Sequence, residues 1–170
     1  MTHHKHPLRW LIWCLAAFFY FYEFVLRVSP NIMAEDWMSS FGIGAAGVSV
    51  LSACYLFSYA PMQIPVGALI DRYGVKKLLS GASLICGGGA LIFSLVSSLP
   101  IAAVGRTLIG AGSAFAFVSM VYITTHWFSP KRRAFLIGLA NSIALLGASA
   151  GGGPLSMMVQ HLGWRASVFI

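Results

Sequence analysis

The sequence predicts an all-α protein that crosses a membrane several times. Of its 170 residues, 58% are hydrophobic and only 9% are charged, and the mean hydropathy is +0.81. Soluble globular domains do not have this composition. The charges are also unevenly spread, because no Asp, Glu, Lys or Arg occurs in residues 38–70 or 78–105. Apolar runs of about 20 residues can cross the hydrocarbon core as helices, so we expect the lipid bilayer to surround this chain.

Five complete transmembrane helices and the start of a sixth are expected between the charged turns. The five cover approximately residues 10–33, 44–70, 78–97, 101–125 and 134–159. Glu35 and Asp36 are then placed in the first outer loop. The turn at 97–100 is so short that the third and fourth spans should be antiparallel neighbours. Residues 161–165 are interpreted as the outer turn before a sixth span, which suggests that the sequence is part of a longer one.

The basic residues predict the orientation of the spans. They concentrate near the N-terminus and at 72–77 and 131–133, whereas the opposite turns hold only Arg165. Because cytoplasmic loops carry the excess of Lys and Arg, the N-terminus is expected inside, with residues 1–9 as a cytoplasmic tail. The expected location is the plasma (inner) membrane. The net charge of +7 does not indicate nucleic acid as a partner, since the basic residues lie in short turns and form no continuous face.

The remaining signals argue against an enzyme. The sequence has no H-E-x-x-H, no G-x-S-x-G and no phosphate-binding P-loop. Cys14, Cys54 and Cys86 all lie in apolar runs without a C-x-x-C pair, so we expect buried thiols and neither a disulfide nor a metal site. No cofactor is expected.

A short charged turn, GALIDRYGVKKLL from Gly67 to Leu79, separates the second and third spans. Gly67 and Gly74 are expected to let the two helices approach and reverse direction. Asp71 and Arg72 would then lie where one helix ends and the next begins, in reach of helix dipoles and partner charges.

This turn resembles the loop between the second and third spans of the major facilitator superfamily of secondary transporters, whose pattern is G-x-L-a-D-r-x-G-r-k-x-x-l. The matching positions are Gly67, Leu69, Asp71, Arg72, Gly74, Lys76 and Leu79. Ile70 replaces the usual small residue and Val75 replaces a basic one, which removes one possible gate contact. The resemblance implies about twelve spans in two similar halves. Residues 10–170 would form most of the first half, with a missing C-terminal half as partner, and Gly67, Asp71, Arg72, Gly74 and Lys76 would belong to the cytoplasmic gate.

Charged residues at membrane depth are costly, by about 2.5–3.5 kcal/mol on insertion scales. Glu23 and Arg27 lie four residues apart on the first span, and Tyr20 and Ala16 extend the same helical face. This stripe is a candidate lining of a central pathway. Two alternatives remain: Arg27 extends toward the outer interface, or the two residues form an ion pair without a transport role.

Arg106 is the third membrane charge. It opens RTLIGAGSA, which resembles the fourth-span pattern R-x-x-q-G-x-g-a-a, with Ile109 in place of a common glutamine. The resemblance implies a role in substrate binding or proton coupling. The alternative is a structural arginine that pairs with backbone carbonyls. On the second span, Tyr59 and Gln63 continue a stripe from Tyr55 that either binds a polar substrate or packs against a neighbouring helix.

The fifth span is rich in small residues before Pro154. From Gly147 to Gly153 they permit close helix approach, and the proline should bend the span. The segment only partly resembles the G-x-x-x-G-P pattern of antiporters, because Ser149 replaces the first glycine. Antiport is therefore not inferred.

The sequence thus predicts a secondary transporter of a small polar or anionic solute that works by alternating access. Proton-coupled symport is expected, with protonation of Glu23 as the coupling step. The residues assigned to the substrate and proton pathway are Tyr20, Glu23, Arg27, Tyr59, Gln63 and Arg106. Residues 20–30 faintly resemble the first spans of organic-anion and nutrient importers in the superfamily, which suggests that an anionic substrate pairs with Arg27 or Arg106. The alternative is a truncated, non-transporting fragment or an interaction subunit.

Overall fold

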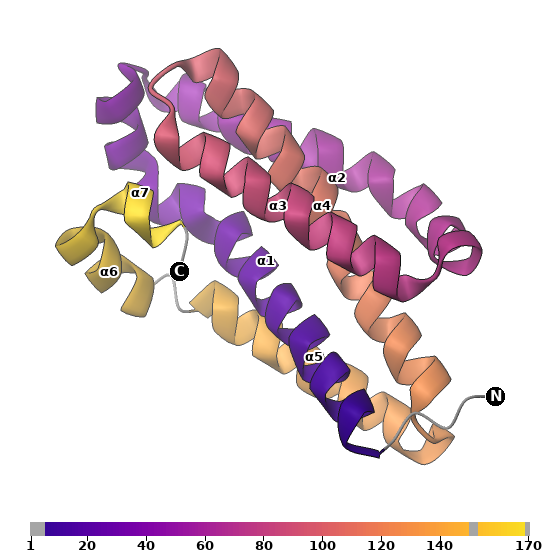
Figure 1. The fold of residues 1–170 in the computed structure, drawn as a ribbon. Helices are drawn as coiled ribbons and strands as arrows, with labels where there is room; N and C mark the ends of the chain where they lie inside the picture. Colours follow the sequence, from indigo (N-terminus) through magenta and orange to yellow (C-terminus); the bar gives the residue numbers. More distant parts are fainter. Residues whose placement is uncertain (1–5, 150–152, 169–170) are drawn as a thin grey trace.

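The computed structural model describes residues 6–149 and 153–168, and the described residues form helices and turns without a strand. Figure 1 shows the helices in chain order, and their bounds are α1 His6–Phe41, α2 Ala45–Tyr73, α3 Val75–Leu95, α4 Leu99–Trp127, α5 Pro130–Ser149, α6 Pro154–Leu162 and α7 Trp164–Ser167. The predicted class, an all-α polytopic membrane protein, is confirmed. The side chains of residues 6 and 7 lie outside the description.

Helices α1 to α4 are each long and apolar enough to cross a membrane. The predicted fifth span corresponds to α5 and α6 together, which pass the same test as a pair and are bent by 44° relative to each other. Pro154 stands at the start of α6, a position where its missing N–H and fixed φ are favourable. The predicted bend at the proline is therefore present, although residues 150–152 lie outside the described part.

The outer end of α1 differs from the sequence prediction. Glu35 and Asp36 were expected in a loop, but α1 continues through both to Phe41. A polar pair does not end a helix beyond the hydrocarbon core, and the fully buried Trp37 fixes this last stretch against the bundle. Only residues 42–44 connect α1 to α2, and Gly42 takes a φ of +62° in that turn. At the other end α1 already begins at His6, inside the predicted tail.

Helix α4 lies at the centre of the bundle and packs against α2 and α3 over much of its length. The short turn at residues 96–98 makes α3 and α4 antiparallel neighbours, as predicted. Glycines permit the close approach, because a Cβ on Gly112 would lie 2.5 Å from the Ala82 carbonyl oxygen of α3. A Cβ on Gly110 would overlap the carbonyl oxygen of Tyr55 in α2. Small residues therefore set the spacing of the bundle.

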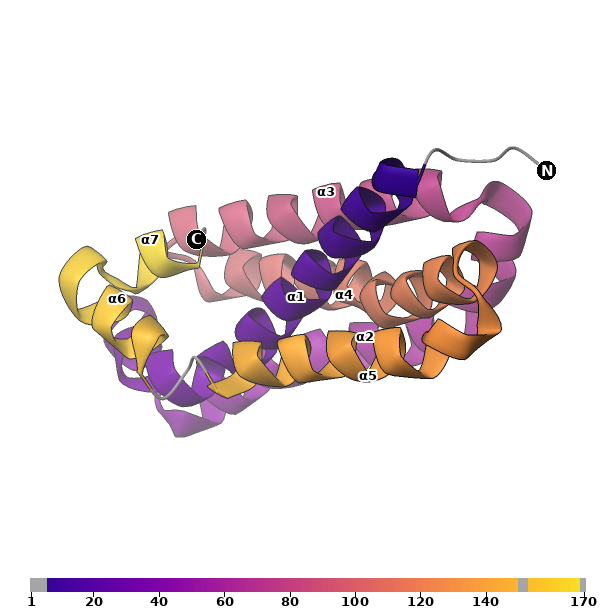
Figure 2. The same ribbon diagram turned by 90° about the horizontal axis from the view of Figure 1, so that it is seen from below.

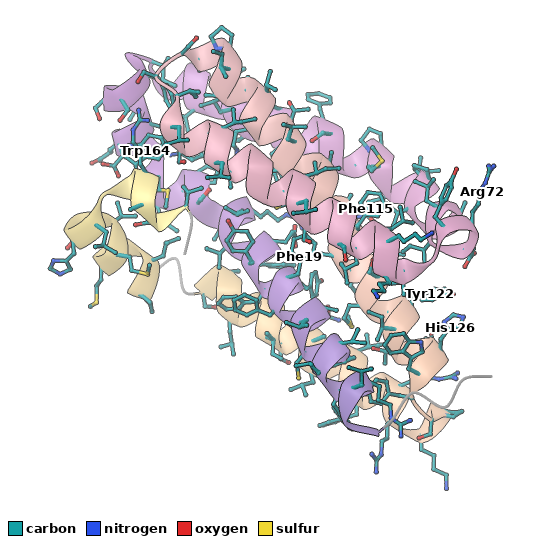
Figure 3. The ribbon with its side chains drawn as sticks, viewed as in Figure 1. Phe19, Arg72, Phe115, Tyr122, His126 and Trp164 are labelled. Carbon is teal, nitrogen blue, oxygen red and sulfur yellow. The ribbon has the colours of Figure 1, made fainter. Side chains whose placement is uncertain are left out.

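Helix α1 packs against α5 on one side and α4 on the other (Figures 1 and 2). A Cβ on Gly147 would lie 2.6 Å from the Phe21 carbonyl oxygen, which confirms close approach at the small-residue stretch of α5. The α2–α3 and α4–α5 turns lie at the same end of the bundle as the start of α1 (Figure 2). Figure 3 shows Arg72 at this end and Trp164 at the other. The basic turns are thus together, and we call this end of the bundle the basic end.

Helix α7 begins at the other end, where the sequence predicted a turn before a sixth span. The turn itself is one residue, Gly163, with a φ of +80°. Trp164 Nε1 donates a hydrogen bond to Ser40 Oγ at 3.0 Å, and Arg165 Nη1 donates to the Ser94 carbonyl at 2.6 Å. Helix α7 is therefore attached to both α1 and α3.

Candidate functional site

A buried carboxylate lies halfway along α1. Glu23 is 0% exposed and, at a rise of 1.5 Å per residue, lies about 25 Å from either end of the helix. The Tyr55 hydroxyl of α2 donates a hydrogen bond of 2.6 Å to Glu23 Oε1, and Arg27 Nη1 lies 3.8 Å from the same oxygen. The second oxygen, Oε2, is buried and accepts no hydrogen bond from the described residues. Such a group is costly unless it binds a proton or another partner.

Arg27 is the partly exposed partner of Glu23. Its side chain is 38% exposed, and its guanidinium lies 5.0 Å from the ring centroid of Tyr59. The guanidinium reaches back toward Glu23, which is one turn closer to the N-terminus. The alternative that Arg27 extends toward the outer end is therefore wrong, and the ion pair that stood as the other alternative is present.

The two predicted stripes meet in space. The rings of Tyr55 and Tyr59 stack at 5.8 Å, and Gln63 interacts with the Tyr59 side chain one turn further along α2. On the other side of Glu23, the Tyr20 hydroxyl donates a hydrogen bond of 3.2 Å to Asn141 Oδ1 of α5. We call the set from these three helices the polar face, and it comprises Tyr20, Glu23, Arg27, Tyr59, Gln63 and Asn141.

Arg106 lies behind the polar face and is 1% exposed. It forms no ion pair with Glu23 in the described part of the chain. Its Nη1 donates to the Leu26 carbonyl at 3.2 Å and to Ser29 Oγ at 3.5 Å, while Nε donates to the Leu51 carbonyl at 3.5 Å. The backbone-paired arginine, one of the two sequence interpretations, is the arrangement that the structure has.

Tyr55 contacts both Arg106 and Glu23. The Arg106 guanidinium lies 5.2 Å from the Tyr55 ring centroid, and the hydroxyl of the same tyrosine donates to Glu23. Sequence reasoning placed Tyr55 on a stripe with Tyr59 but did not assign it to the site, and it did not assign Asn141 either. The four-residue spacing of aromatic and polar residues on α2 was the available signal for Tyr55. Its contact with a residue 32 positions away was not visible in that spacing.

The predicted gate lies at the basic end. Gly74 alone connects α2 to α3 and takes a φ of +84°, a conformation that favours glycine. Asp71 and Arg72 lie in the last turn of α2, and the Arg72 guanidinium lies 5.3 Å from the Tyr73 ring. The expected close approach of the two helices at Gly67 and Gly74 is wrong, because a Cβ on either glycine would meet no atom within 4 Å.

Lys76, the remaining gate candidate, lines a groove between α1 and α3. The groove has a volume of about 610 Å³ and is bordered by Leu8, Ile12, Leu15, Phe19, Leu79, Ser80, Ser83 and Trp127.

Of the three thiols, Cys86 is buried, Cys54 is partly buried and Cys14 is exposed. The prediction of a buried thiol is therefore wrong for Cys14. An exposed thiol on a spanning helix needs no polar partner, because sulfur is only weakly polar.

Membrane-length helices with buried ionisable side chains within them define a polytopic membrane protein. The chain belongs to the Major Facilitator Superfamily, whose sequence model matches residues 12–170. The resemblance seen in the charged turn is thereby confirmed, and the chain is not an enzyme.

Several curated relatives are named for anions. The chain is 27% identical over 162 residues to the probable sulfoacetate transporter SauU of Cupriavidus necator, covering 95% of this chain and 38% of the relative. It is 31% identical over 145 residues to the hexuronate transporter of Bacillus subtilis, covering 83% and 33%. It is 25% identical over 174 residues to the probable anion transporter 7 of rice, covering 100% and 39%. The chain thus spans less than two fifths of the length of these relatives.

Proposed function

We propose that the chain forms most of the first half of a proton-coupled symporter for a small anionic solute. The observation that carries the proposal is the buried Glu23, which pairs with a half-exposed Arg27 and keeps one carboxylate oxygen without a partner. Charged groups at membrane depth face a protein interior or a water-filled cavity rather than lipid. The exposed side of Arg27 is therefore expected to face the central pathway. The relatives named for sulfoacetate, hexuronate and anions agree with a cationic site.

Charge balance provides the coupling. Without solute, Glu23 and Arg27 neutralise each other. When a proton binds Glu23 and a singly charged anion binds Arg27, the site is neutral again. A site holding only the proton or only the anion carries a net charge, which is costly at this depth. The neutral forms are then the ones that change conformation, so proton and anion move together.

The other pathway residues have supporting roles in this proposal. Tyr20, Tyr59 and Gln63 present hydrogen-bonding groups beside Arg27 and orient the solute. Arg106 takes part through Tyr55 and not by touching the solute. At the basic end, the gate comprises Gly67, Asp71, Arg72, Gly74 and Lys76 and closes the inner side as the halves rock. The N-terminus and the basic end are proposed to face the cytoplasm of the plasma (inner) membrane.

The test is uptake into proteoliposomes by the full-length reading frame that contains this chain. A sulfonate and a uronate are supplied with and without an inward proton gradient, and Glu23→Gln is compared with the wild type. We expect gradient-driven accumulation in the wild type and its loss in Glu23→Gln, with solute exchange retained. Glu35→Gln, at an exposed position near the outer end of α1, is the matched control. Gradient-driven accumulation that survives Glu23→Gln would count against the proposal.

The second candidate function is a fragment or interaction subunit that transports nothing by itself. The chain spans less than two fifths of the length of the relatives named above, and both candidates are tested in one assay. The 170-residue chain is therefore assayed beside the full-length frame. Transport by the longer form alone supports the symporter, and a frame of only 170 residues that is inert supports the second candidate.

A further inference from the structure

We infer that Arg106 is a positioning residue that replaces the hydrogen bond Pro30 removes from α1, and that it thereby fixes the helix beside Glu23. The inference concerns how the proposed site is held together. Its first link, between Arg106 and the proline, does not depend on what the protein transports.

Pro30 leaves a carbonyl of α1 without its helical donor. Proline has no N–H, so the carbonyl four residues earlier, that of Leu26, lacks its i,i+4 partner. That carbonyl instead accepts from Ser29 Oγ at 2.8 Å and from Arg106 Nη1 at 3.2 Å. The arginine comes from α4, 80 positions along the chain. A distant side chain therefore takes the place of a missing backbone donor.

The same guanidinium reaches α2. Its Nε donates to the carbonyl of Leu51, one turn before Tyr55, and its carbon lies 5.2 Å from the Tyr55 ring centroid. The rings of Trp37 and Phe93 lie 5.2 and 5.7 Å away, so carbonyl dipoles and aromatic faces hold the cation, with no carboxylate partner among residues 6–149 and 153–168. One side chain thus holds the proline site of α1 and the tyrosine that donates to Glu23.

This position separates Arg106 from the solute. The side chain is 1% exposed, and the Tyr55 ring lies against its guanidinium. Arg27, with 38% of its side chain exposed, is the cation that an anion reaches. Changes at Arg106 should therefore alter the stability and turnover of the protein, while changes at Arg27 alter its affinity for the solute.

The experiment is a double-mutant cycle between Arg106→Gln and Pro30→Ala in the purified full-length protein, read as the thermal unfolding midpoint. Alanine at position 30 restores the N–H that the Leu26 carbonyl lacks. We expect Arg106→Gln to lower Tm by about 5 °C or more in the wild-type background, and by at most half of that shift beside Pro30→Ala. Equal shifts in the two backgrounds would overturn the inference.

Two variants make the cycle specific. Pro61→Ala restores an N–H at another in-helix proline, on α2 and exposed, and should not reduce the effect of Arg106→Gln. Arg106→Lys keeps a cation that can donate to the Leu26 carbonyl and should give an intermediate Tm. It also serves if Arg106→Gln does not fold. Rescue by Pro61→Ala equal to that by Pro30→Ala would overturn the inference.

Transport gives the second readout. Arg106→Gln is expected to lower the maximal uptake rate while KM for the anion stays within about twofold, a sign that ground-state binding is unchanged. A KM increase of about tenfold or more would place Arg106 in the binding site and overturn its role as a positioning residue. If the wild type moves no anion, the proposed function fails while the Tm cycle still decides the link between Arg106 and Pro30.

Discussion

Arg27 and Arg106 are two arginines linked through Tyr55, whose hydroxyl donates to the Glu23 partner of Arg27 and whose ring lies against Arg106, and their surroundings differ. Arg27 has a carboxylate partner within its own helix and keeps 38% of its side chain exposed. Arg106 is 1% exposed, and its partners among the described residues are neutral, namely carbonyls, a hydroxyl and aromatic rings. The difference teaches that the role of a charged residue in the membrane depends more on its partners than on its depth. An ion pair that a ligand can reach is suited to exchange, whereas a buried guanidinium that donates to two other helices is suited to holding helices together.

The largest effect is expected from a substitution that forces α2 and α4 apart. In Gly110→Val, the new side chain overlaps the Tyr55 carbonyl, so α2 and α4 must separate. The loss of stability should exceed about 3 kcal/mol and abolish the folded protein in detergent, as followed by size-exclusion chromatography and Tm. Gly138→Val, where no atom lies within 4 Å of the added Cβ, is the control and should fold. A folded Gly110→Val protein with unchanged Tm would show that this packing is not required.

Tyr55→Phe separates the two uses of one side chain. The ring that lies against Arg106 is kept, and the hydroxyl that donates to Glu23 is lost. Losing a hydrogen bond to a charged group costs about 1.5–3 kcal/mol, so coupled uptake should fall strongly. Tyr55→Leu removes both uses and should lower Tm further than Tyr55→Phe. If the two variants have the same Tm, the ring contributes nothing to the Arg106 side.

Arg27→Gln tests the accessible cation. We expect KM for the anion to rise about tenfold, equal to about 1.4 kcal/mol, because a charge-assisted contact is lost. The change in Tm should be smaller than for Arg106→Gln, because Glu23 can bind a proton once its cationic partner is removed and keeps its hydrogen bond from Tyr55. Initial uptake rates over a range of solute concentrations provide KM, and an unchanged value would remove Arg27 from the binding site.

The smallest effect belongs to Ser29→Ala. Its hydroxyl donates to the Leu26 carbonyl and accepts from Arg106 Nη1. The hydroxyl and the guanidinium therefore both donate to the carbonyl that Pro30 leaves without a helical donor. We expect a loss of about 0.5–1.5 kcal/mol, seen as a Tm shift of a few degrees. Ser39→Ala, an exposed position near the end of α1, should show no comparable shift.

The sequence was sufficient for features that depend on local spacing. Charge-free runs predicted the spanning helices, and four-residue spacing placed Glu23 and Arg27 on one helical face, where the ion pair was one of the alternatives. Glu35 and Asp36 misled the prediction of the first loop, because charges mark the edge of the hydrocarbon core and not the end of a helix.

Contacts between helices were not predictable in the same way. The hydrogen bond from Tyr55 to Glu23 and the donation from Arg106 to Leu26 depend on how far each helix is rotated and where it crosses its neighbour. Residue spacing within one helix contains neither quantity. The resemblance of the Arg106 segment indicated the importance of that arginine but not its partners.

The glycines of α4 have a mechanical consequence. Gly105 and Gly112 lie against backbone atoms of α3, and Gly110 lies against the backbone of α2. Turning α4 about its own axis would bring a bulkier neighbour such as Ile109 into one of these contacts. Helix α4 therefore cannot rotate about its axis without a clash, and a force that turns it also moves α2 and α3. A motion that begins at Glu23 is expected to displace these three helices as a single rigid body.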